Sequence, residues 1–85
     1  MQITVLYFAS LREQIGLQRE LLELPATVQS LGALRDWLIG RGTPWSLALA
    51  NGKAVRMAID QMISGPETPL RAGAEVAYFP PVTGG

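Results

Sequence analysis

Apolar and polar residues alternate along three segments of the chain, two of which lie near its ends. Residues 2–8 are rich in β-branched and aromatic side chains and partly alternate, which is typical of a strand with one buried face. Residues 19–24 alternate charged and apolar side chains with one slip, and Pro25 closes this second strand. Residues 75–79 form the last predicted strand.

Leucine and isoleucine at a spacing of four predict a short helix after the first strand. Leu11 and Ile15 would share one face of a helix over residues 9–15. Ser10 is the expected N-cap and Gly16 the expected stop. The pattern therefore changes from strand to helix within a few residues of Phe8.

The main helix is expected where three leucines recur at helical spacing. Leu31, Leu34 and Leu38 form this apolar stripe. Thr27 is the expected N-cap, and Gly40 is expected to end the helix. Residues 45–49 remain ambiguous between a further helical turn and an irregular stretch.

Two short strands, 55–59 and 62–63, are predicted around a tight turn at Asp60-Gln61. The resulting order of strand, short helix, strand, long helix and further strands is an α+β pattern. A main helix laid across one face of a mixed sheet satisfies this order, which is the β-grasp or ubiquitin-like roll. We expect residues 1–79 to form this domain, with the first and last strands central.

The composition excludes the common catalytic devices. The 85 residues, of which 48% are hydrophobic and 16% charged, suit one folded domain. Cysteine and histidine are both absent. This removes disulfides, thiolate nucleophiles, Ser-His-Asp triads and the usual zinc ligands. We therefore expect no bound metal, and no catalysis by this chain alone.

The charge balance and hydropathy point away from nucleic acid and membrane. Seven basic residues balance seven acidic ones, whereas proteins that bind phosphate backbones are basic. The start of the chain has no basic region before its short apolar run, and no stretch approaches a membrane span. A cytoplasmic protein is the expectation.

The carboxyl end carries the clearest chemical signal. It comprises Pro80, Pro81, Val82, Thr83, Gly84 and Gly85. The prolines lack an N–H and fix φ, so we expect residues 80–85 to leave the sheet as an extended tail. A terminal Gly-Gly has no Cβ and could enter a narrow channel of another protein. A frayed end is the alternative interpretation of the dipeptide alone.

A free carboxylate is ionised at neutral pH and is a poor acyl donor. The Gly85 carboxylate would therefore need activation, most simply as an acyl-adenylate made from ATP. No phosphate-binding loop is present in the sequence. We expect ATP to bind to an activating partner.

Four segments resemble a known family. Residues 70–85, LRAGAEVAYFPPVTGG, closely resemble the ending of the small subunit of molybdopterin synthase, a ubiquitin-like sulfur carrier. Residues 6–13, LYFASLRE, resemble the start of the same family, and residues 45–52 and 58–64 resemble it more loosely. One departure is at residues 72–74, where alanines flank the glycine and members of the family often have acidic residues.

The resemblance implies a function at Gly85. In that family an adenylyltransferase resembling the ubiquitin-activating enzyme adenylates the terminal glycine, which becomes a thiocarboxylate. Two carriers bind a dimer of the large synthase subunit, forming a heterotetramer. The sulfur is then donated to cyclic pyranopterin monophosphate, and the carrier itself holds no cofactor.

Apolar residues near the tail are candidate partner-binding residues. Counting by two along the last strand places Phe79 on the face opposite to the buried one. The same count places Phe8 on the less buried face of the first strand. The resembling family uses apolar residues at these positions and at the position of Met62 to bind the large subunit. The alternative is that both phenylalanines cover the rim of the core.

The other prominent residues are given no functional role. Trp37 and Trp45 are expected to pack against the core. The adjacent pairs Arg12-Glu13 and Arg35-Asp36 are expected on solvated faces.

Three further functions remain open. A sulfur carrier for thiamine thiazole synthesis would share the chemistry, although it suits shorter chains without the Phe-Pro-Pro ending. A ubiquitin-like modifier would be joined through Gly85 to lysines of target proteins. A passive β-grasp interaction module would not need Gly84 or Gly85.

Overall fold

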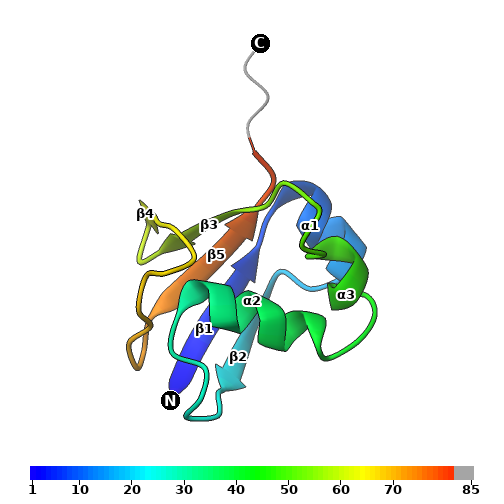
Figure 1. Cartoon of the computed structure of the whole chain (residues 1–85). Helices are drawn as coiled ribbons and strands as arrows, with labels where there is room; N and C mark the ends of the chain where they lie inside the picture. The colour runs from blue at the N-terminus through cyan, green and yellow to red at the C-terminus, as the bar shows by residue number, and fades with distance from the viewer. Residues whose placement is uncertain (82–85) are drawn as a thin grey trace.

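A computed structural model describes residues 1–81 of the chain. One mixed sheet and three helices make up this part (Figure 1). The elements, in chain order, are β1 (Gln2–Tyr7), α1 (Ala9–Ile15), β2 (Arg19–Glu23), α2 (Leu31–Ile39), α3 (Trp45–Ala48), β3 (Arg56–Ile59), β4 (Met62–Ile63) and β5 (Glu75–Phe79). The ambiguous segment after the main helix is thus helical, as α3.

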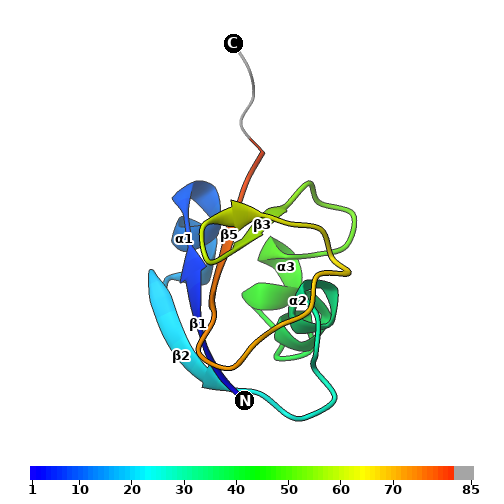
Figure 2. The same cartoon turned by 90° about the vertical axis from the view of Figure 1, so that its left-hand side faces the viewer.

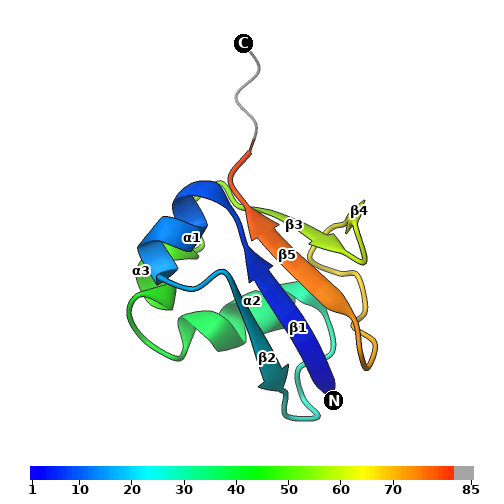
Figure 3. The same cartoon turned by 180° about the vertical axis from the view of Figure 1, so that it is seen from behind.

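The strands form one five-stranded sheet in the order β2-β1-β5-β3-β4. The first and last strands pair in parallel in its interior, with Tyr7 beside Tyr78, and the other pairs are antiparallel. Figure 2 shows α2 and α3 on one side of the strands, and Figure 3 shows the sheet in front of α2. The predicted β-grasp roll, with interior first and last strands, is confirmed.

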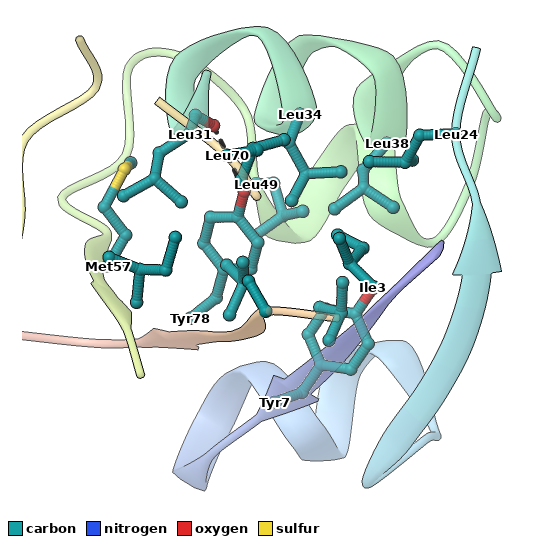
Figure 4. Packing of buried hydrophobic residues seen from close by; sticks show 14 of the residues in the cluster. Ile3, Tyr7, Leu24, Leu31, Leu34, Leu38, Leu49, Met57, Leu70 and Tyr78 are labelled. Atoms are coloured by element: carbon teal, nitrogen blue, oxygen red, sulfur yellow. Dashed lines mark hydrogen bonds between the residues drawn. The ribbon is translucent and has the colours of Figure 1, made fainter. Parts of the chain in front are cut away.

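The core lies between the sheet and α2. Leu31, Leu34 and Leu38 project from α2 onto the strands (Figure 4) and are fully buried, as the leucine stripe predicts. Beneath them the rings of Tyr7 and Tyr78 stack with their centroids 6.4 Å apart. Burial of closely packed apolar side chains contributes most to the folding free energy of a small domain.

Both predicted N-caps are wrong. Ser10 lies inside α1, because Phe8 occupies the N-cap position with extended backbone angles. In α2 the cap is Ser30, whose hydroxyl accepts a hydrogen bond from the amide of Ala33 at 3.1 Å. Thr27 instead lies in a turn before the helix. The predicted stop of α1 at Gly16 is confirmed by its left-handed φ of 83°.

The expectation that Arg35 lies on a solvated face is also wrong. Its guanidinium crosses from α2 to the chain that follows α3. The Nε atom donates to the carbonyl of Leu49 at 2.8 Å, and an Nη atom donates to the carbonyls of Ala50 at 2.8 Å and Lys53 at 3.1 Å. Because one planar cation satisfies three carbonyls, Arg35 fixes the path of the loop that leads into β3.

The packing role expected for the two tryptophans is confirmed. Both are partly buried against the core, and the Arg41 guanidinium carbon lies 3.9 Å from the ring centroid of Trp45 and 5.7 Å from that of Trp37. Arg41 also pairs with Glu20 of β2 at 3.1 Å. The Tyr7 hydroxyl donates to Glu20 and accepts from the Trp45 indole N–H. Burial, and then Glu20, raise the pKa of Tyr7, so its hydroxyl remains a donor.

Replacing Arg35 with methionine is expected to lower the free energy of unfolding by about 2–3 kcal/mol, because three carbonyls lose a charged donor. Urea denaturation measures the loss. The control is Arg12→Met, at an exposed residue of α1, which should change stability by no more than about 0.5 kcal/mol. Equal effects of the two substitutions would contradict the role assigned to Arg35.

Candidate functional site at the exit of the carboxyl-terminal segment

The described chain leaves the sheet at the end of its central strand. β5 ends at Phe79, and Pro80 and Pro81 follow without backbone N–H groups for a sheet ladder. The amide of Phe8 donates to the carbonyl of Tyr78 at 3.1 Å on one side, and Arg56 lies opposite Phe79 on the other. The exit is therefore held between the end of β1 and the start of β3 (Figure 1).

Half-buried Pro80 and Pro81 begin the predicted tail at this exit. The other four predicted tail residues, Val82, Thr83, Gly84 and Gly85, lie outside the described residues. Their roles remain predictions from the sequence.

The sheet has an inner face toward α2 and an outer face that no helix covers within residues 1–81 (Figure 3). Val76 and Tyr78 are fully buried on the inner face, whereas Phe79 is partly exposed on the outer face. Phe8 follows Tyr7 at the end of β1 and is 45% exposed. The alternation predicted for both strands is confirmed, and it brings the two phenylalanines to the same end of the outer face.

Met62 lies elsewhere. It pairs with Ile59 of β3, and Ile59 pairs in turn with Val76 of β5, which is on the inner face. Because directly opposite residues of neighbouring strands share one face of the sheet, Met62 lies on the α2 side at the sheet edge. Its neighbour Ile63 pairs with Ala58 and shares the outer face instead. The structure therefore groups Phe8 with Phe79 and does not bring Met62 onto their face.

Met62 borders an open pocket of about 350 Å³ away from the exit. The pocket is lined by Ile59, Asp60, Met62, Ser64, Thr68, Pro69 and Arg71. At its rim, Asp60 accepts a hydrogen bond from the amide of Glu75 at 3.0 Å and pairs with Arg71. The Glu75 amide, and then Arg71, hold the pKa of the Asp60 carboxyl below its usual value. Asp60 thus joins the β3–β4 turn to the start of β5 through the Glu75 amide, and to the loop before β5 through Arg71.

Sequence reasoning missed part of the outer face. Leu6, Ala77 and Ala58 form one row across β1, β5 and β3. Counting by two places Leu6 with Phe8 and Ala77 with Phe79, but it did not identify Ala58. Leu21 of β2, 64% exposed, extends the apolar surface at the sheet edge. The position of Arg56 beside Phe79 had no sequence signal, since strand register is set by tertiary pairing.

A metal-binding cluster and a membrane-length helix are both absent from the part of the chain that the structure describes. Within residues 1–81, no three acidic side chains are placed to hold a metal ion. No helix in the same range is long and apolar enough to cross a bilayer. What the described residues offer is a segment, Pro80-Pro81, that leaves the middle of the sheet beside an exposed apolar surface.

Sequence comparison decides the family. Residues 5–85 match the family described as the ThiS family. The chain belongs to the ThiS family. It is 41% identical over 83 residues to a protein of Escherichia coli (strain K12) named "Molybdopterin synthase sulfur carrier subunit", across 98% of this chain and 99% of that protein. The resemblance identified from the sequence is thereby confirmed.

Solved structures support the same fold. The chain resembles SAMP1 from Haloferax volcanii with a TM-score of 0.76 and 22% identity, over the full length of both chains. It also resembles a chain in the complex of subunits 1 and 2 of molybdopterin-converting factor from Helicobacter pylori, with a TM-score of 0.66, 23% identity and full coverage of both. These likenesses concern the fold, which this ThiS-family member shares with both proteins.

The two faces of β1 should respond differently to truncation. Tyr7→Ala is expected to lower the free energy of unfolding by about 3–5 kcal/mol, because it empties a fully buried site. The adjacent Phe8→Ala should cost about 1 kcal/mol, since nearly half of Phe8 is exposed. Urea denaturation of both variants provides the comparison. A cost at Phe8 as large as that at Tyr7 would place Phe8 in the core and not on a docking surface.

Proposed function

We propose that this chain is a sulfur carrier for molybdopterin synthesis and acts through a thiocarboxylate on Gly85. One observation carries the proposal. The chain ends in Gly84-Gly85 and is 41% identical, over nearly its whole length, to a protein named as a molybdopterin synthase sulfur carrier subunit. Residues 1–79 would be the folded domain and residues 80–85 the working tail.

The chemistry begins with activation of the Gly85 carboxylate. One carboxylate oxygen attacks the α-phosphorus of ATP on a partner adenylyltransferase, pyrophosphate leaves, and an acyl-adenylate forms. A sulfur nucleophile at the oxidation level of hydrosulfide then attacks the acyl carbon, and AMP leaves with the electrons of the C–O bond. The product is a thiocarboxylate, whose sulfur is a better nucleophile than the original oxygen.

Delivery of that sulfur would take place in the large synthase subunit. The thiocarboxylate sulfur attacks a carbon of the cyclic pyranopterin monophosphate precursor and displaces an oxygen substituent, which leaves with the electrons of its C–O bond. Water later cleaves the acyl–sulfur bond, which restores the carboxylate and leaves the sulfur on the precursor. This chain contributes the reactive atom, and the partner contributes the pocket. ATP is thus a substrate of the activating enzyme, and this chain needs no resident cofactor.

The tail sequence suits insertion into a narrow channel. Pro80 and Pro81 stiffen the base of the tail, and Gly84 and Gly85 have no side chains that could obstruct a channel. Val82 and Thr83 would provide the contacts between them. The exit from β5, held by backbone pairing on both sides, supports this role because the start of the tail is fixed relative to the outer face.

Partner binding would use apolar residues around the exit. Phe8 and Phe79 form the centre of this surface, and exposed aromatic residues of this kind often dominate interface energetics. Met62, 71% exposed at the sheet edge, would make a separate peripheral contact. A large synthase subunit is the proposed partner, and the Helicobacter pylori complex of subunits 1 and 2 is a precedent for such a pair. Two carriers would bind one dimer of large subunits in the cytoplasm.

Deleting Gly85 is expected to abolish molybdopterin formation while the domain still folds, since the deletion lies beyond the sheet. The measurement combines complementation of a molybdenum-cofactor mutant with urea denaturation of the purified variant. Thr27→Ala, in an exposed turn far from the exit, is the control and should complement fully.

The outcomes separate the competing functions. Full complementation by the chain lacking Gly85 would overturn the proposal and favour a passive interaction module. Complementation of a thiazole-synthesis mutant alone would assign the chain to thiamine synthesis. Gly85-dependent isopeptide conjugates in cell extracts, with no effect on molybdopterin, would identify a protein modifier.

A further inference from the structure

Charge is unevenly distributed along the sheet, although the net charge is zero. Arg19 begins β2 beside Leu6 and Arg56 begins β3 beside Phe79, so both lie at the exit end. At the opposite end, Glu23 finishes β2 and Glu75 begins β5. The register therefore places two cations at the exit end of the sheet and two carboxylates at its far end. Glu13, which follows Arg12 on α1, is an exposed carboxylate near the exit end.

Two more cations belong to the exit end. Arg12 lies on α1, and its amide donates to the carbonyl of Phe8 at 3.3 Å. Lys53 lies in the loop that leads into β3. Together with Arg19 and Arg56 they form the basic collar, defined here as Arg12, Arg19, Lys53 and Arg56. All four residues are exposed.

The fold does not use the charges of the collar. In the part of the chain that the structure describes, no salt bridge involves any of the four side chains. The remaining three arginines are all engaged. Arg41 pairs with Glu20, Arg71 pairs with Asp60, and Arg35 binds three carbonyls. The cations with structural partners are thus distinct from those at the exit.

Two residues of the collar lie beside the exposed phenylalanines. Arg56 neighbours Phe79 in the sheet, and Arg12 lies one helical turn from Phe8. An apolar centre with a charged rim is the usual arrangement of a protein–protein interface. Nucleic acid would require a basic excess across the domain, which the balanced charge does not provide.

We infer that the basic collar docks on an acidic rim around the tail-accepting channel of the large synthase subunit, and so guides the tail into that channel. The inference rests on the proposed function, because it assigns surface chemistry to the same partner. Opposite charges at an interface rim mainly accelerate association, whereas the buried apolar centre determines how long the complex lasts. The collar would therefore act before Phe8 and Phe79 are buried.

The test compares two full-length double variants with the same net charge. Arg19→Gln with Arg56→Gln removes two charges from the collar. Ala26→Glu with Thr27→Glu adds two negative charges in the exposed turn after β2, at the opposite end of the sheet. Stopped-flow mixing with the cognate large subunit gives association and dissociation rates at low and high salt.

The collar variant is expected to associate about tenfold more slowly than wild type at low salt and to approach it at high salt, while its dissociation rate stays within about twofold. The Ala26/Thr27 variant should associate within about twofold of wild type. Arg19→Lys with Arg56→Lys should restore the rate, because it retains the charges. Wild-type association should itself slow as salt is raised, which tests the inference without any substitution.

Two results would overturn the inference. Salt-independent binding of wild type, or equal slowing by the two charge-matched variants, would eliminate a specific role for the collar while leaving the carrier function intact. Failure of wild type to bind the large subunit at any salt concentration would instead refute the proposed function, and the collar's role with it.

Discussion

The parallel pairing of β1 with β5 is the constraint on which the rest of the structure depends. It joins the first strand of the chain to the last, from Thr4 beside Glu75 to Tyr7 beside Tyr78. The sheet can therefore be completed only after the whole domain has been made, and its folding requires contacts between distant residues. The same pairing sets where the chain leaves the domain, at the middle of one sheet end and not at an edge.

The two faces of the sheet differ in how far they are buried. Tyr7 and Tyr78 face α2 and hold the core together, whereas Phe8 and Phe79, one residue later in each strand, face outward. A one-residue slip in register would exchange the two sets. The fold thus keeps an apolar surface exposed beside the exit of the chain without weakening the core, and Arg35 holds the loop that leads to the other side of the exit.

Much of this arrangement could be predicted because it depends on local patterns. The strands, the leucine stripe of α2 and the outward position of Phe79 all follow from side-chain periodicity. The errors concern interactions that periodicity does not encode. Ser30, and not Thr27, caps α2 because the chain turns before the helix begins. Arg35 was expected on a solvated face because its carbonyl partners lie 14 or more residues away in the sequence. The position of Met62 depends on the β3–β4 pairing in the same way.

The central claim is that the Gly85 carboxyl group is loaded with sulfur. Its most direct test is intact-mass spectrometry, with fragmentation, of the carrier isolated from cells that contain the cognate loading machinery. The account predicts a fraction heavier by one sulfur-for-oxygen exchange, located at residue 85 and lost on incubation with the large subunit and its precursor. Persistent absence of that species, with the loading machinery active on another carrier, would contradict the account.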